Sequence, residues 1–133
     1  MRMRLLAAVG ALVSAGVHLK LWTDGFRDQH VIGPAFMLNA VAGVVIAILL
    51  LTWRRHWLPL FLALGFGAST LGAFIIATTV GLFGVHERWV GGYVFAAAIS
   101  EAVIILASLV GLLHEGPVRR TASPRSAVAA RTR

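Results

Sequence analysis

Four long apolar runs alternate with short polar segments along this chain. A helix needs about 20 mostly apolar residues to cross a hydrocarbon core roughly 30 Å thick. The apolar runs occupy about 5–22, 34–52, 58–83 and 91–113, and each is close to that length. The pattern therefore predicts an all-α integral membrane protein in which residues 1–115 form one four-span domain.

The polar segments between the runs are short and carry the charges that predict orientation. Short connections make neighbouring helices antiparallel, so we expect an up-down-up-down four-helix bundle. Nine of the 12 Lys and Arg residues fall on the side of the chain ends, namely Arg2, Arg4, Arg54, Arg55, Arg119, Arg120, Arg125, Arg131 and Arg133, and the other three are Lys20, Arg27 and Arg88. The positive-inside rule then predicts a plasma-membrane protein with both termini in the cytoplasm.

The first run has a second interpretation. Residues 1–15 resemble a cleaved signal peptide, because an Arg-rich start and an apolar middle precede the small residues Ser14 and Ala15. The apolar sequence continues through Leu19 and Trp22, however, which favours a first transmembrane helix.

Composition limits the possible chemistry. A chain with 59% hydrophobic and 13% charged residues is too apolar for a soluble domain. The net charge of +7 comes largely from arginines that flank the apolar runs, so it does not indicate nucleic-acid binding. The chain has no cysteine, which excludes disulfides and thiol catalysis. No cofactor is predicted.

The last residues, 116–133, form a separate segment. They include five arginines and two prolines and almost no large apolar side chain. Such a composition cannot bury a core, so we expect a disordered cytoplasmic tail. Its arginines would bind anionic lipid headgroups at the membrane surface.

Glu101 lies near the middle of the fourth run. An ionised carboxylate at that depth costs several kcal/mol unless it is paired, hydrated or protonated, so we expect it to face the protein interior. Ala97, Glu101 and Ser108 share one helical face at i, i+4 and i+11. Two interpretations stay open: a structural hydrogen bond to a neighbouring helix, or a proton, cation or ligand site.

The other polar residues of the runs fall at two depths, estimated from the helical rise. The outer layer contains His18, Asn39 and Thr78, and the layer of Glu101 contains Ser14, Ser69 and Thr70. Gly10, Ser14 and His18 follow one another at i+4 on one helix face. If that face points inward, a polar column leads from the outer surface to Glu101, with His18 as the outer relay.

Small residues recur at four-residue spacing in the second and third runs. Gly43 and Ala47 continue such a stripe in the second run, and Gly65 and Gly72 belong to two overlapping stripes in the third. Small residues let helix backbones approach closely in membranes. These positions are therefore predicted to pack helices together, including helices of a second copy or of a larger membrane partner.

A metal site is the weaker alternative for the histidines. His18, His30 and His86 are predicted on the outer side together with acidic residues, a ligand set that suits zinc or copper. No local spacing such as H-x3-H supports it, so interfacial histidines without a metal are the default. Haem would need two embedded histidines, and only His18 is clearly embedded.

Three segments carry a resemblance to a known group: Arg4-Leu5-Leu6, the stretch Ser14-Ala15-Gly16-Val17-His18-Leu19-Lys20-Leu21, and Ile32-Gly33. In these segments, roughly from Arg4 to Leu51, the chain resembles the DoxX-like group of small bacterial four-helix membrane proteins. The resemblance implies a four-helix fold and an accessory role beside membrane redox or thiol-stress systems. It provides no counterpart of Glu101 and no catalytic residue.

These observations predict a non-catalytic accessory or scaffold subunit of a membrane complex. The alternative is a proton-linked small-solute carrier or ligand-binding bundle that uses Glu101 and His18. An enzyme is the least favoured class, because the chain has no cysteine nucleophile, no paired carboxylates and no dinucleotide or phosphate loop.

Overall fold

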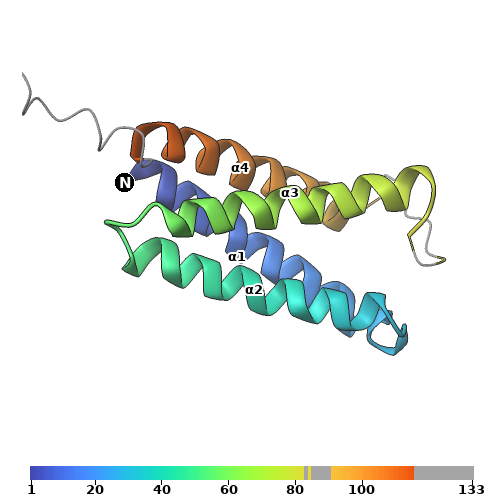
Figure 1. Ribbon diagram of the computed structural model, residues 1–133. Helices are drawn as coiled ribbons and strands as arrows, with labels where there is room; N and C mark the ends of the chain where they lie inside the picture. The colour runs from blue at the N-terminus through green and yellow to red at the C-terminus, as the bar shows by residue number, and fades with distance from the viewer. Residues whose placement is uncertain (83, 85–90, 116–133) are drawn as a thin grey trace, which may run out of the picture.

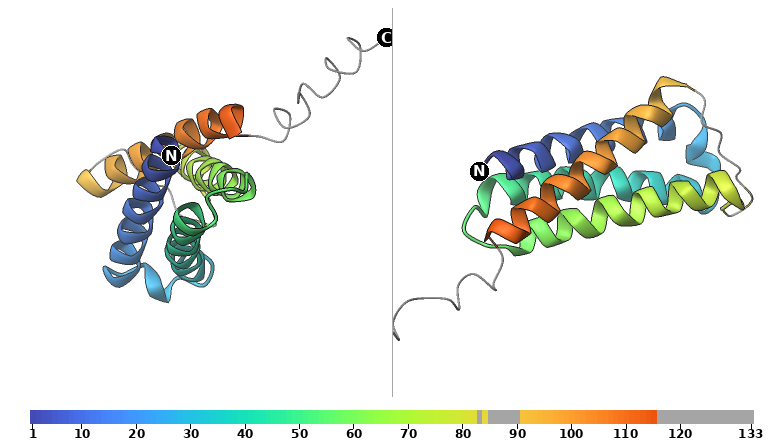
Figure 2. Two further views of the ribbon diagram at one scale, coloured as in Figure 1. Left: turned by 90° about the vertical axis from the view of Figure 1, so that its left-hand side faces the viewer. Right: turned by 90° about the horizontal axis from the view of Figure 1, so that it is seen from above.

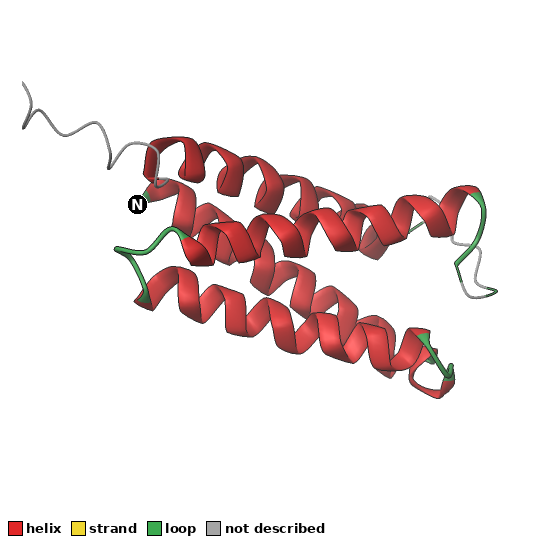
Figure 3. Cartoon of the chain, viewed as in Figure 1, coloured by secondary structure: helices red, strands yellow, loops and turns green. Residues whose placement is uncertain are grey.

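The computed structural model describes residues 1–82, 84 and 91–115. Their helices are α1 (Arg2–Thr23), the short 3₁₀ helix η1 (Phe26–Asp28), α2 (Ile32–Thr52), α3 (Leu58–Thr79) and α4 (Gly92–Glu115) (Figures 1 and 3). All four α-helices are long and apolar enough to cross a membrane. The predicted all-helical, multi-pass membrane architecture is therefore confirmed for this part of the chain. His86 and the predicted tail, 116–133, lie outside the described residues.

The helix boundaries correct two of the predicted ends. The third helix was expected to continue to residue 83, but α3 ends at Thr79. Gly81 adopts a left-handed φ of 86°, and its N–H donates a 3.0 Å hydrogen bond to the Ile76 carbonyl, which caps the helix. Helix α2 begins at Ile32, earlier than Pro34, where the prediction had placed the start. Hydropathy alone did not indicate either end.

The four helices pack mainly in the order α2, α1, α4, α3, and the contact between α2 and α3 that would close a square bundle is small. Helix α1 packs against α2 and α4, α3 packs chiefly against α4, and α2 and α3 share few contacts. Figure 2 shows α4 running obliquely across α1 and α3. Helix α2 is consequently held mainly by α1, and α3 mainly by α4.

Glycines permit the close approach of the backbones at each of these interfaces. A Cβ added to Gly43 of α2 would lie 2.7 Å from the Ala11 carbonyl oxygen of α1. A Cβ on Gly10 of α1 would lie 3.2 Å from the carbonyl oxygen of Ser100, and one on Gly67 of α3 would lie 3.2 Å from that of Glu101. Such contacts are typical of membrane helix pairs that pack through small residues.

The small residues predicted to pack helices together do so in α2 but not in α3. Gly43 and Ala47 are buried in the bundle, as expected for packing positions. Gly65 and Gly72 are not: a Cβ added to either would meet no described atom of the chain within 4 Å. The face of α3 that packs against α4 carries Gly67. Gly65 and Gly72 therefore do not pack helices of this chain together, although the sequence had predicted that they would.

Arg4 joins three parts of the chain at one end of the bundle. Its side chain is only 2% exposed. It donates hydrogen bonds to the Glu115 carboxylate at 2.7 Å and to the carbonyl oxygens of Trp53 at 3.2 Å and His56 at 2.6 Å. The start of α1, the α2–α3 connection and the end of α4 therefore meet here (Figure 1). The sequence had suggested only a flanking charge for Arg4.

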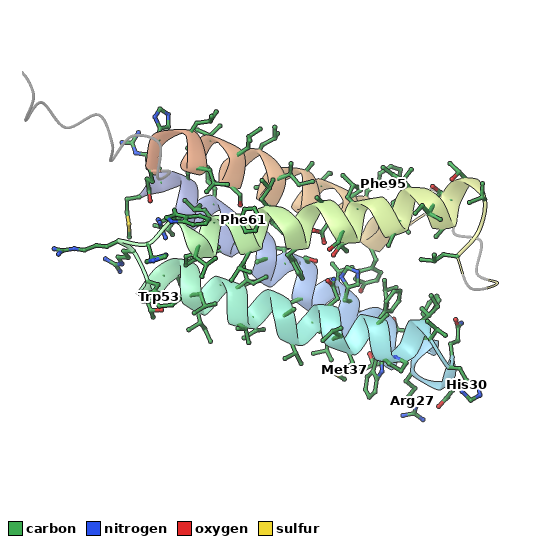
Figure 4. The ribbon with its side chains drawn as sticks, viewed as in Figure 1. Arg27, His30, Met37, Trp53, Phe61 and Phe95 are labelled. Atoms are coloured by element: carbon green, nitrogen blue, oxygen red, sulfur yellow. The ribbon has the colours of Figure 1, made fainter. Side chains whose placement is uncertain are left out.

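The side chains at the two ends of the bundle differ. Figure 4 shows Trp53 at the Arg4 end and Arg27 and His30 at the opposite end. The buried apolar core lies toward the Arg4 end and consists of Ala7, Ala8, Ala11, Ile46, Ala47, Leu50, Leu60, Ala63, Phe66, Ile104 and Ala107. Large apolar side chains such as Leu38, 70% exposed, cover the outside, as expected for a surface in contact with lipid.

Replacing Gly43 by Ala should lower the thermal unfolding midpoint in detergent. The added methyl group would overlap the Ala11 carbonyl of α1, and overpacking of this kind costs about 1–3 kcal/mol. Gly16→Ala is the matched control, because a Cβ at Gly16 meets nothing within 4 Å. Circular dichroism melts of both variants provide the comparison. Equal midpoints would contradict the close contact between α1 and α2.

Candidate functional site

Glu101 of α4 is buried, with 1% of its surface exposed. Its Oε1 accepts a hydrogen bond from the Ser14 hydroxyl of α1. Its Oε2 is buried and has no hydrogen-bond partner among the residues that the structure describes. The carboxyl group is therefore half satisfied, and one oxygen remains free for a proton or a ligand.

The meeting of Ser14 and Glu101 follows from the local packing of α1 on α4. Gly10 lies one turn before Ser14, and the absence of a side chain there lets α1 approach the Ser100 carbonyl and Ile104. Ser14 is fully buried at this contact. The i+4 spacing of Gly10, Ser14 and His18 had predicted an inward-facing polar stripe, and the structure places all three in the bundle interior.

His18 lies one turn beyond Ser14 and is 8% exposed. Its Nδ1 is 2.8 Å from the Ser14 carbonyl oxygen, which can only accept, so Nδ1 carries a proton and donates it. In the neutral ring, Nε2 is then the acceptor. The imidazole ring packs against Phe36 of α2 in a T-shaped arrangement, with ring centroids 5.3 Å apart.

Asn39 of α2 meets Thr70 of α3. The Thr70 hydroxyl lies 2.9 Å from the Asn39 Oδ1 and 2.9 Å from the carbonyl oxygen of Phe66. The Asn39 Nδ2 is buried and has no partner among the described residues. The depth estimate had grouped Asn39 with Thr78 instead, but the Thr78 hydroxyl donates to the Ile75 carbonyl of its own helix at 3.0 Å.

A cavity of about 480 Å³ lies between the four helices. It is lined by the late part of α1, the early part of α2, the late part of α3 and the early part of α4, which is the half of the bundle away from Arg4. Its polar lining residues are His18, Asn39, Ser69, Thr70 and Glu101. Thr78 is not among them. The volume suits a drug-sized or smaller organic molecule.

The remaining lining of the cavity is apolar and rich in aromatic rings. Phe26, Phe36, Phe74 and Tyr93 contribute the aromatic side chains. The sequence analysis did not identify these residues. The available signal was their position, because each lies in the part of an apolar run nearer to the 23–33 or 84–90 connection, or in the 23–33 connection itself.

Among the described residues, the cavity lining contains one acidic side chain and no Lys or Arg. Besides Glu101, its titratable groups are His18 from α1 and Tyr93 from α4, and α2 and α3 supply none. Lys20 is the nearby cation: its Nζ lies 5.8 Å from the centroid of the Tyr93 ring and is paired with the Asp24 carboxylate. Glu101 therefore supplies the only acidic charge in the described lining.

The histidines do not assemble a metal site in the described part of the chain. No group of three His, Asp or Glu side chains there could hold a metal ion. His30 is exposed and does not line the cavity that His18 lines. The suggested set of His18, His30 and His86 cannot be completed here, because His86 lies outside the described residues.

Comparison of the chain with protein-family models, curated proteins and solved structures found no match. The resemblance to the DoxX-like group therefore stays an expectation from sequence. The function has to be argued from the geometry of the cavity and its side chains.

Ser14→Ala should destabilise the protein by about 1–3 kcal/mol, because the buried Glu101 carboxyl loses its one donor. In a Glu101→Leu background the same change should cost less than half as much, since no acceptor remains. Ser108→Ala is the control, because the buried Ser108 hydroxyl has no hydrogen-bond partner among the described residues. Thermal melts of the four members of this double-mutant cycle measure the coupling. Equal costs in both backgrounds would contradict a stabilising Ser14–Glu101 bond.

Proposed function

We propose that this protein is a ligand-binding bundle of the membrane that takes up a small, largely apolar molecule in a proton-linked manner. The observation that carries the proposal is the buried Glu101, whose Oε2 has no partner among the described residues and whose side chain lines a cavity of about 480 Å³. Leaving a buried polar atom without a partner costs about 1–3 kcal/mol. Intramembrane carboxyl groups of this kind typically belong to proton or substrate pathways.

The division of the bundle into two halves supports this function. The Arg4 contacts and the apolar core close one half. The cavity occupies the other half, with His18 and Asn39 beside it. A ligand would therefore enter from the cavity end, and His18 would relay protons to Glu101.

We further propose that the helices cross the plasma membrane up-down-up-down with both chain ends in the cytoplasm. The excess of Lys and Arg on the side of the termini supports this orientation. The Trp53 and Trp57 pair beside the Arg4 contacts supports a position of this end of the bundle at a membrane interface, because tryptophans are enriched at both interfaces. In this orientation the cavity half faces the outer leaflet.

Native mass spectrometry of the protein, extracted gently from its own membrane, tests the ligand-binding function. The wild-type chain is expected to retain a small molecule as added mass. Ala97→Phe should lose it, because Ala97 lines the cavity and a phenyl ring would fill it. Ile99→Phe is the matched control on the same helix, since Ile99 is 63% exposed on the outside.

The proton link predicts a second result in the same experiment. Retention of the molecule by the wild type should change with pH, and Glu101→Gln should reduce that dependence to the part that His18 contributes, because the amide does not titrate. A wild-type chain that carries no molecule at any pH would contradict the proposal. So would equal retention in Ala97→Phe and Ile99→Phe.

A second candidate function is that of an accessory or scaffold subunit. The observation that favours it is the outer face of α3, where Gly65 and Gly72 have no described neighbour within 4 Å of a Cβ. Such a face allows close packing against a helix of a second copy or of a larger membrane partner. Anionic lipid at the basic tail would add to the attachment of the subunit.

Gly72→Leu should disrupt an assembly formed through α3. The bulkier side chain would hold the partner helix away from the small-residue face. Gly16→Leu is the control, because Gly16 also has open space around it but lies on α1. Crosslinking in the native membrane, followed by gel analysis, measures the assembled fraction. The association constant derived from it should fall at least about tenfold for Gly72→Leu, which corresponds to about 1.4 kcal/mol. An equal fraction in both variants would exclude an α3 interface.

A further inference from the structure

The charge of the cavity indicates what kind of ligand it accepts. Its described lining holds one carboxyl group and no Lys or Arg. When Glu101 is ionised, the charge sits in a largely apolar enclosure, where Coulomb interactions are stronger than in water. An anionic ligand would meet repulsion there, and a neutral ligand would leave the charge unpaired.

Two side chains of the cavity lining, Glu101 and His18, carry acceptor atoms. Oε2 of Glu101 has no partner among the described residues and accepts hydrogen bonds once the group is ionised. His18 donates through Nδ1 to the Ser14 carbonyl, which leaves Nε2 as the acceptor of the neutral ring. Both side chains line the cavity. Both acceptors carry negative charge or partial charge, so they attract a cation electrostatically whether or not the cation has an N–H group.

The aromatic walls add a second feature that suits a cation. Phe26, Phe36, Phe74 and Tyr93 line the same cavity. The face of an aromatic ring attracts a cation, and the attraction is stronger in a desolvated site than at an exposed one. One of these rings already has a cation beside it, because the Lys20 ammonium lies 5.8 Å from the centre of the Tyr93 ring.

We propose that the ligand of this cavity is a monovalent organic cation with an apolar body, bound in exchange for the proton of Glu101. This inference rests on the proposed ligand-binding function and adds the substrate class. In the exchange, the O–H bond of the Glu101 carboxylic acid breaks and its proton leaves to water. The carboxylate then pairs with the cation, and no oxidant or reductant takes part.

The exchange predicts the direction of the pH dependence. Protons compete with the cation for Glu101, so affinity for the cation should rise as the pH rises until the carboxyl group is fully ionised. The other titratable groups in the lining are His18 and Tyr93, and Lys20 with Asp24 lies beside Tyr93. His18 becomes positively charged at low pH, which acts in the same direction.

Isothermal titration calorimetry of the full chain in detergent tests the substrate class with three probes. Benzyltrimethylammonium is permanently charged, so its own charge does not change with pH. Neopentylbenzene has the same shape without the charge and is measured by its competition with the cation. Phenylacetate supplies an anion of similar size.

The cation is expected to bind to the wild type, and Glu101→Gln should weaken its binding by about 30-fold or more, as for the loss of one partner from a buried charge pair. Glu101→Asp keeps the charge and should bind more tightly than Glu101→Gln. Ser108→Ala is the control, since Ser108 is buried on the same helix but does not line the cavity. At acidic pH, a dye in weak buffer should report about one proton released per cation bound.

Several results would overturn the assignment. Equal cation affinity in the wild type and Glu101→Gln, or undiminished binding by Ala97→Phe, would place the cation elsewhere. Tighter binding of neopentylbenzene or phenylacetate than of the cation would assign another substrate class and leave the ligand-binding function intact. If none of the probes binds, the cation assignment fails. The proposed function fails with it only if native mass spectrometry also finds no retained molecule.

Discussion

The hydrogen bond from Ser14 to Glu101 is the interaction on which the arrangement of this bundle depends. A carboxyl group at the depth of the hydrocarbon core has no water to bind, so its partner must come from the protein. That requirement turns the Glu101 face of α4 toward α1. The missing side chain of Gly10 allows the two backbones to come close enough, at the Ser100 carbonyl, for the bond to form.

The contact between Ser14 and Glu101 separates a tightly packed half of the bundle from the half that contains the cavity. Toward the Arg4 end, alanines and glycines let the helices pack tightly, and Arg4 satisfies carbonyl groups and a carboxylate there. Toward the other end, the aromatic side chains and the sparse contact of α2 with α3 leave a cavity. Glu101 bonds to α1 with one oxygen, its other oxygen has no partner among the described residues, and its side chain borders this cavity.

The two candidate functions use different surfaces of the protein. Ligand binding uses the cavity between the helices, whereas an accessory role uses the outer face of α3 with Gly65 and Gly72, neither of which lines the cavity. One protein can therefore hold a ligand and pack against a partner at the same time. The geometry favours ligand binding, because a buried unpaired carboxyl oxygen needs a chemical explanation that an unpacked lipid-facing glycine does not.

The sequence by itself determined the four membrane helices, since hydropathy over a helix length reflects the thickness of the bilayer. It also indicated the inward faces of Glu101 and Ser14, because polar groups avoid lipid. Only the tertiary structure decided the pairing of Asn39 with Thr70 rather than Thr78, the burial of Arg4, and the outward position of Gly65 and Gly72. These depend on the rotation and crossing of each helix against its neighbours, and the spacing of residues within one helix does not specify them.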